Sequence, residues 1–355
     1  PQQNLWLDKL DAERSNFSAA LEWCRLQGPK SEAGLKLAGL LSIFWQVRGY
    51  LGEGRWWLEE AFLAGSEISP QIQAKAWVGA GMLAYTQSDY DRAIELLKTS
   101  FAVYERIDDK CGMGATLNCL GTVSRDRGRY DEAYQYHNQA LALHRLCGDT
   151  IEIAESLNSM GLSALYQAQY DLASERFAEC KSYWEQSFNT RGIARVTNNM
   201  GLTAYYQSQF DLAIMLCRDS LKRFELLGDK WGRAITLVNL SRIALEQGQY
   251  KFSLQLARQS LTLSQEINYR ENIAECLEAL ANTLASIEQL DLGAKVLGYA
   301  NRLREKIGAP LPPSDKPYHE HTSEILQRAL GDELFKRRLL EGSLSDLLPM
   351  LLTDS

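Results

Sequence analysis

Three asparagines recur at one position of the sequence, and their side chains could bind a peptide. Asn118, Asn158 and Asn198 are spaced forty residues apart. An amide side chain both donates and accepts hydrogen bonds, so a column of amides could hold the main chain of an extended peptide. The same amides could instead bond neighbouring helices and fix how the repeats stack. Both interpretations stay open at this point.

Tyrosine and arginine side chains accompany this column. Tyrosines combine apolar area with a polar tip, which is common at binding surfaces. Arg125 also forms a basic cluster with Arg127 and Arg129 at a helix turn, which is either a solvated turn or a site for an anionic partner. The candidate peptide-binding residues are Asn118, Asn158, Asn198, Tyr166, Tyr205, Tyr206, Arg125, Arg195 and Arg242.

Residues that could support catalysis are sparse. The motifs GxxxxGK[ST], HExxH and GxSxG do not occur, and there are only four histidines. His137 and His144 share one predicted helix, while His319 and His321 lie near a proline-rich segment; we expect surface or packing roles for both pairs. We predict a protein that is not an enzyme, with no catalytic residue, no cofactor and no metal site. An enzyme would need acids or histidines of shifted pKa gathered in one cleft.

The cysteines are scattered along the chain. They number seven, an odd count, and no CxxC motif occurs. We therefore expect reduced cysteines that pack as small hydrophobic residues in a cytosolic protein. Zinc binding is the alternative, and the cysteine spacing does not support it.

The elements that must position these side chains repeat every forty residues. One position of the repeat is aromatic in six cases out of seven: Tyr50, Tyr90, Tyr130, Tyr170, Phe210, Tyr250 and Leu290. Turn residues punctuate each repeat twice. Between the turns, apolar residues at i, i+3, i+4 and i+7 predict amphipathic helices. Each repeat is therefore predicted to be a pair of helices, A and B.

Small residues are expected where the two helices of a pair cross. In the third complete repeat, the pattern predicts helix A at about 111–127 and helix B at about 130–147, with Gly121 at the crossing. Gly161 and Gly201 should likewise face helix B of their own repeat at close approach. A single pair cannot bury its own apolar face, so the pairs must stack into a solenoid.

The spacing of small residues resembles the tetratricopeptide (TPR) family. Gly121, Ala133 and Ala140 carry the resemblance, which extends over about residues 35–308. The usual TPR repeat has about 34 residues, and this longer repeat is similar to the variants of bacterial signal-transduction regulators and kinesin light chains. The resemblance implies an all-α, right-handed superhelical solenoid of about seven helix pairs with a C-terminal helical cap. TPR arrays serve many functions, so the fold does not specify one.

Both ends of the chain resemble a narrower class. The segments 5–24 and 35–62 are similar to the junction that follows the ATPase and winged-helix domains of bacterial STAND-type transcriptional regulators such as the maltose-regulon activator. Residues 297–315 resemble the closing segment of the same proteins. This implies an ATPase domain upstream of Pro1, which stands in place of Met and suggests an excised piece. For Trp45, Trp56 and Trp57 we expect packing in the core of the first pair.

Four segments are expected along the chain. An N-terminal helix would join the missing upstream domain, and prolines would end the last helix of the solenoid. The expected segments are the N-terminal helix at 1–30, the TPR solenoid at 31–308, a proline-rich linker at 309–317 and capping helices at 318–355.

Composition limits the partners. The net charge of −7 argues against nucleic-acid binding. No apolar run approaches the roughly 18 residues needed to span a bilayer, and no signal peptide is evident. We expect a cytoplasmic protein without membrane contact.

Two functions remain. The leading hypothesis is a sensor or interaction domain of a STAND-type ATPase, which binds a protein, a peptide or a small-molecule effector and so controls the upstream ATPase. The alternative is a free-standing TPR adaptor or scaffold that binds an extended peptide in its concave groove.

Overall fold

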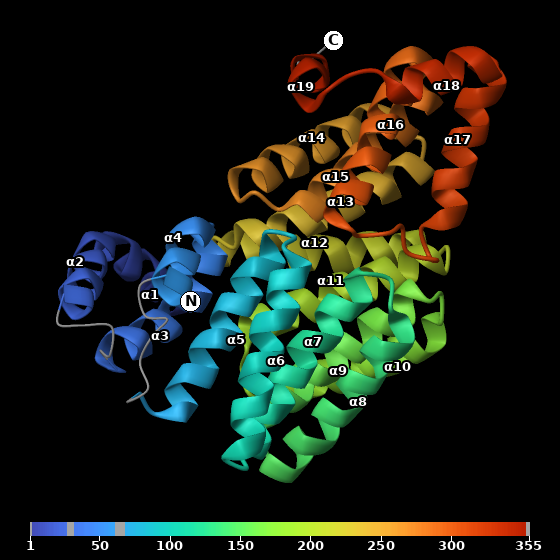
Figure 1. Ribbon diagram of the computed structural model, residues 1–355. Coiled ribbons are helices and arrows are strands. Elements are labelled where there is room, and N and C mark those ends of the chain that lie inside the picture. Colours follow the sequence, from blue (N-terminus) through green and yellow to red (C-terminus); the bar gives the residue numbers. More distant parts are fainter. Residues whose placement is uncertain (1, 27–31, 61–67, 353–355) are drawn as a thin grey trace. The chain divides into compact units, whose positions relative to one another are not determined.

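The chain folds into helices that pack in consecutive pairs (Figure 1). The computed structural model describes residues 2–26, 32–60 and 68–352, and these ranges contain no strand. The prediction of an all-α, TPR-like solenoid is confirmed. The chain forms two compact units: unit 1 comprises residues 1–163, 175–192 and 226–229, and unit 2 comprises residues 164–174, 193–225 and 230–355.

Six regular repeats follow the forty-residue period without a shift. The A helices are α5 (Pro70–Thr86), α7 (Lys110–Asp126), α9 (Thr150–Tyr166), α11 (Thr190–Tyr206), α13 (Lys230–Glu246) and α15 (Arg270–Ser286). The B helices are α6 (Tyr90–Arg106), α8 (Tyr130–Cys147), α10 (Tyr170–Gln186), α12 (Phe210–Leu227), α14 (Tyr250–Glu266) and α16 (Leu290–Ile307). Each B helix therefore begins at the recurrent aromatic position or, in the last repeat, at leucine.

The turns between these helices repeat every twenty residues. Each contains one residue with positive φ, which reverses the chain direction after a helix. Glycine occupies only some of these positions, although a left-handed backbone favours it. The positions are Ser88, Asp108, Gly128, Gly148, Ala168, Phe188, Ser208, Gly228, Gly248, Asn268, Glu288 and Gly308.

Close helix crossings hold each pair together, as the sequence predicted. A Cβ atom added to Gly161 would lie 2.5 Å from the ring of Phe177 on α10, and one added to Gly201 would lie 2.6 Å from Cys217 Sγ on α12. Serines of the recurrent small position in the B helices add hydrogen bonds to the A helices. For example, Ser260 Oγ donates to the carbonyl oxygen of Ala234 at 2.6 Å.

The ends of the chain are less regular. The N-terminal segment contains two helices, α1 (Gln2–Ala12) and α2 (Arg14–Leu26), where one was expected. The first pair consists of α3 (Glu32–Arg48), α4 (Leu51–Arg55) and the π-helix η1 (Trp56–Glu60). The chain closes with α17 (Lys316–Leu330), α18 (Asp332–Leu340) and α19 (Leu344–Leu352). Residues 1, 27–31, 61–67 and 353–355 of the expected segments lie outside the described residues.

The tryptophan prediction is correct for two residues and wrong for the third. Trp45 and Trp57 are buried, whereas Trp56 is 45% exposed. Trp57 and the adjacent Leu58 belong to the buried core cluster, and Trp56 packs edge-on against Trp57 with ring centroids 4.5 Å apart.

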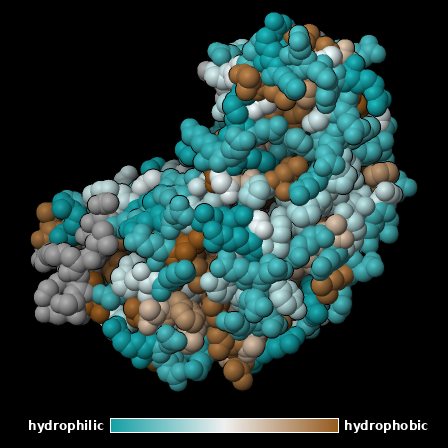
Figure 2. Space-filling view, turned by 45° about the vertical axis from the view of Figure 1, so that its right-hand side comes forward, coloured by the Kyte–Doolittle hydropathy of each residue, from teal (hydrophilic) through white to brown (hydrophobic). Residues whose placement is uncertain are grey.

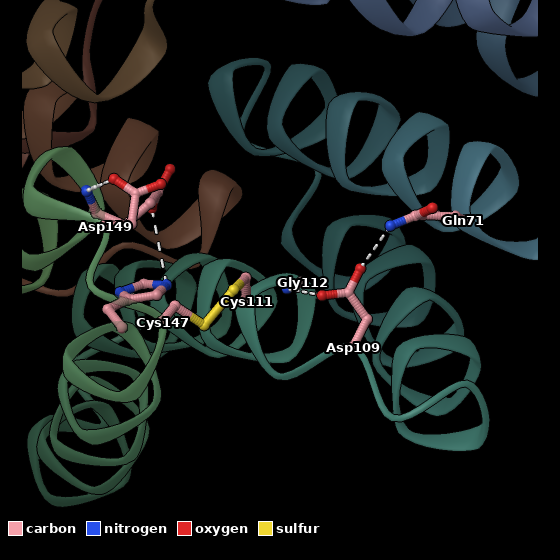
Figure 3. Close-up of a disulfide and its surroundings, with 8 residues drawn as sticks. Gln71, Asp109, Cys111, Gly112, Cys147 and Asp149 are labelled. Carbon is pink, nitrogen blue, oxygen red and sulfur yellow. Dashed lines mark hydrogen bonds and ion pairs between the residues drawn. A yellow bond between two sulfur atoms is a disulfide. The ribbon is translucent and has the colours of Figure 1, made fainter.

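A disulfide overturns the expectation that all cysteines are reduced (Figure 3). Cys111 in the first turn of α7 bonds to Cys147 at the end of α8, with an S–S distance of 2.16 Å. Helices A and B of a repeat run antiparallel, so the start of A and the end of B meet at one end of the pair. The remaining cysteines, Cys24, Cys119, Cys180, Cys217 and Cys276, form no disulfide.

The surface is mostly hydrophilic on the face that Figure 2 shows, with hydrophobic side chains in small separate groups. Within the described ranges, none of the helices combines the length and apolar character required to cross a membrane.

Candidate functional site

The candidate site is the A-helix face, which we define as the asparagine position of each A helix and the positions four, seven and eight residues later. An α-helix has 3.6 residues per turn, so these positions share one side. In unit 1 the face is carried by α5, α7 and most of α9. In unit 2 it is carried by the last residues of α9 and by α11, α13 and α15.

In unit 1 the asparagines are engaged within the fold. The ring nitrogen Nδ1 of His137, on the B helix of the same repeat, donates to Asn118 Oδ1 at 2.8 Å. Burial, with a contribution from Arg125, lowers the pKa of His137 to about 3, so the ring is neutral. Asn158 is buried, with 1% of its surface exposed. For Asn118 the contact favours the structural interpretation.

The predicted basic cluster in unit 1 is matched by acids. Arg125 is buried, and its Nε donates to Asp126 Oδ1 at 2.7 Å. Arg127 Nη1 donates to Asp91 Oδ1 at 2.6 Å. These pairs favour a structural role for the cluster over a site for an anionic partner.

In unit 2 the third asparagine links two A helices. Asn239 Nδ2 on α13 donates to Asn198 Oδ1 on α11 at 3.2 Å, and both side chains are buried. This is the stacking role considered for the column. Arg195 lies half-buried on α11, about one helical turn earlier.

A non-helical segment of the same chain lies against the A-helix face of unit 2. Residues 309–315 connect α16 to α17 without helix. The main-chain nitrogen of Ser314 donates to the carbonyl oxygen of Tyr166 at 3.1 Å. The hydroxyl group of Tyr206 donates to the carboxylate of Asp315, and Arg242 Nη1 lies 3.4 Å from Asp315 Oδ1. Three predicted binding residues therefore contact the chain's own segment.

Aromatic rings strengthen this contact. Tyr318, in the first turn of α17, stacks on Tyr205 with ring centroids 5.4 Å apart. Tyr206 in turn stacks on Tyr170, with centroids 5.6 Å apart. Stacked aromatic pairs contribute roughly 0.5–1.5 kcal/mol beyond the area they bury.

The charges in this region are buried and coupled. Burial opposes the charge of Arg242, but Asp315, Tyr206 and Glu275 raise its pKa well above the usual value. Burial raises the pKa of Glu275 to about 7, against the opposing effect of Arg242. Burial and the neighbouring Asp315 raise the pKa of Tyr206. Arg242 is thus a buried cation that depends on surrounding carboxylates.

A second ion pair and a small cavity complete the region. Arg304 Nη2 donates to Glu278 Oε2 at 2.9 Å. Beside this pair lies a cavity of about 40 Å³, which could hold a few water molecules. Its polar lining includes Tyr205, Arg242, Glu278, Asn282, Asp315 and His319.

The structure groups only some of the predicted residues. Tyr166, Tyr205, Tyr206 and Arg242 come together around residues 314–318. Asn118, Asn158 and Arg125 belong to unit 1. That the whole column forms one contiguous binding surface stays a prediction.

The sequence interpretation missed Asp315 and Tyr318, which it assigned to a linker and a capping helix. An acidic residue directly before a proline-containing helix start was a visible local signal. Its partner Tyr206 is 109 residues away, and no periodic pattern connects the two.

One buried polar cluster in unit 1 resembles a catalytic arrangement. Ser156 Oγ lies 2.8 Å from His144 Nδ1, and Glu152 Oε2 lies 3.8 Å from His144 Nε2. Ser156 and His144 are completely buried, so a substrate would not reach the serine. We interpret the cluster as packing. No group of three or more histidine, cysteine or acidic residues suited to a metal ion was found within the described part of the chain.

Comparisons with known proteins agree with this architecture. A family model described as tetratricopeptide repeat matches residues 112–186 and 192–266. No curated protein matches the sequence.

Three solved structures resemble the chain at low identity. A Rap protein complexed with competence and sporulation factor has a TM-score of 0.60 and 13% identity, and the match covers 95% of this chain and 97% of that one. The Rap conjugation gene regulator of plasmid pLS20, in complex with the Phr* peptide, has a TM-score of 0.55 and 15% identity, covering 96% and 97%. The APC/C hetero-tetramer Cut9–Hcn1 has a TM-score of 0.53 and 18% identity, covering 79% and 48%.

At these identities the likeness concerns the fold alone. The family match and the register of the helix pairs agree on the nature of the repeat. Residues 112–186 and 192–266 match the tetratricopeptide repeat model, and the fold of the chain is TPR-like.

Proposed function

We propose that this chain is a non-catalytic TPR module that binds a peptide or an exposed protein segment on its A-helix face. One observation carries the proposal: in unit 2 this face already holds a non-helical segment through a main-chain hydrogen bond and an ion pair, and the first turn of α17 through a ring stack. A surface that holds its own chain in this way has the chemistry to hold another.

The structural comparisons support the same interpretation. Two of the similar structures, which match over almost their full lengths, are described as complexes with a peptide or with competence and sporulation factor. We favour the peptide-binding alternative over a STAND-type sensor because it rests on contacts within this chain, whereas the ATPase hypothesis rests on resemblance at the two ends.

We assign the peptide to the A-helix face of unit 1. Its positions Val78, Met82, Thr122 and Leu162 are partly exposed, and they combine apolar side chains with a polar one. Partly exposed apolar groups flanked by hydrogen-bonding groups suit a peptide that alternates side-chain and main-chain contacts.

A peptide library tests this assignment. Random peptides selected on the immobilised chain should bind it, and the double variant Met82→Glu with Thr122→Glu should weaken their binding at least tenfold, or about 1.4 kcal/mol. The matched control, Thr99→Glu with Tyr134→Glu, adds the same charges at exposed positions of α6 and α8 and should leave the dissociation constant unchanged. Equal weakening by both variants, or a failure to select any peptide, would contradict the proposal.

A further inference from the structure

Asp315 stands at the start of α17 but does not cap that helix. It occupies the N-cap position, yet its side chain makes no capping hydrogen bond. An aspartate at this position usually accepts from the amides of the first turn. Here the carboxylate is instead buried, accepts from Tyr206 and pairs with Arg242. The side chain of Asp315 therefore contacts α11 and α13 instead of capping its own helix.

Three features of residues 314–318 contact the A-helix face of unit 2. The amide of Ser314 donates to Tyr166 on α9, the carboxylate of Asp315 meets α11 and α13, and the Tyr318 ring stacks on α11. By contrast, the intervening Lys316 and Pro317 are exposed. A polar amide, a carboxylate and an aromatic ring three residues later therefore make up the recognised pattern.

The buried Arg242 on α13 requires the carboxylate of Asp315 to balance its charge. Arg242 is largely buried, with 13% of its side chain exposed, and its other acidic neighbour, Glu275, is 4.0 Å away. Removing one partner of a buried charge pair leaves the other charge uncompensated, which is strongly unfavourable. If residues 314–318 left the face, Arg242 would need another carboxylate in the same place.

We propose that residues 314–318 are a displaceable internal ligand, and that the same site accepts from a protein partner a helix-starting segment with an acidic residue followed three residues later by an aromatic one. The inference deepens the proposed function, since it treats the A-helix face of unit 2 as a binding surface that the chain itself occupies. Partner binding then releases the start of α17.

The test uses the full chain and a fluorescent peptide with the sequence of residues 309–322. The double variant Asp315→Ala with Tyr318→Ala weakens the internal ligand, so it should bind the peptide at least tenfold more tightly than the unmodified chain. Adding Arg242→Met to this variant should abolish the binding. The control Lys316→Ala with Glu320→Ala, at exposed positions of the same segment, should behave like the unmodified chain.

Circular dichroism establishes that each variant is folded. If the double variant unfolds, the isosteric Asp315→Asn replaces it and should also bind more tightly than the unmodified chain. Equal or absent binding by the folded variant and the unmodified chain overturns the inference, because the segment is then a fixed structural brace. Library peptides that still depend on Met82 and Thr122 would in that case leave the proposed function standing. If the double variant binds peptide 309–322 but the library yields no binding peptide, the inference stands and the proposed function fails.

Discussion

At the scale of single residues, several charged side chains of unit 2 are buried. Arg242, Glu275 and Asp315 lie together in unit 2, and Glu278 pairs with Arg304 beside them. Such a group is retained at a cost in desolvation. Its titration should therefore be visible in the stability of the folded chain.

Glu275 provides the clearest case. Its pKa is raised from 4.5 to about 7, chiefly by burial. Between these values the folded chain holds a proton that the unfolded chain has released, so the free energy of unfolding should fall as the pH rises through this window. Glu275→Gln should remove about 1–3 kcal/mol of this pH dependence.

Urea unfolding at pH 5 and pH 8 measures the effect. The control Glu305→Gln, at an exposed position of α16, should keep the slope of the unmodified chain. The same slope in Glu275→Gln as in the unmodified chain would show that this carboxylate does not titrate in the window.

The asparagine column shows how far residue types can be interpreted from sequence alone. The column itself was visible, and so were its two possible roles. Choosing between them required knowing that His137 meets Asn118 and that Asn239 meets Asn198. Asn239 lies one residue beyond the forty-residue column, so the periodic pattern does not point to it.

At the scale of helices, the forty-residue period predicted the positions and boundaries of the repeated helices. The expected helices at about 111–127 and 130–147 are Lys110–Asp126 and Tyr130–Cys147, because turn residues and apolar spacing repeat without insertion. The disulfide was not predicted, and although a linker at 309–317 was expected, its contacts with α9, α11 and α13 were not. These contacts occur once in the chain, whereas a periodic sequence pattern indicates only contacts that recur in each repeat.

The turn geometry can be tested with two alanine-to-glycine substitutions that should change stability in opposite directions. Ala168 has a φ of 60° between α9 and α10, where a non-glycine residue costs about 1 kcal/mol. Ala168→Gly should therefore raise the free energy of unfolding by about 0.5–1 kcal/mol. The identical change at Ala142, exposed within α8, should lower it by about 0.5–1 kcal/mol. Chemical denaturation of both variants checks this, and a loss of stability in both would contradict the assigned turn geometry.

At the scale of the whole molecule, stacked helix pairs in each unit carry an A-helix face, which we propose as the binding surface. The residues on that face differ between several repeats, although asparagine recurs in three of them, while the turns between helices keep one spacing. Val78 and Asn118 are equivalent positions with different side chains, whereas the helix boundaries remain on one period. Variation on a constant scaffold is expected of a recognition surface.

Photo-crosslinking tests this claim most directly. A library-selected peptide carrying a benzophenone group would be irradiated with the full chain, and the attached residues would be identified by mass spectrometry. We expect adducts on the A helices of unit 1, within 70–86 and 110–126. Adducts confined to the B helices, within 90–106 and 130–147, would contradict it.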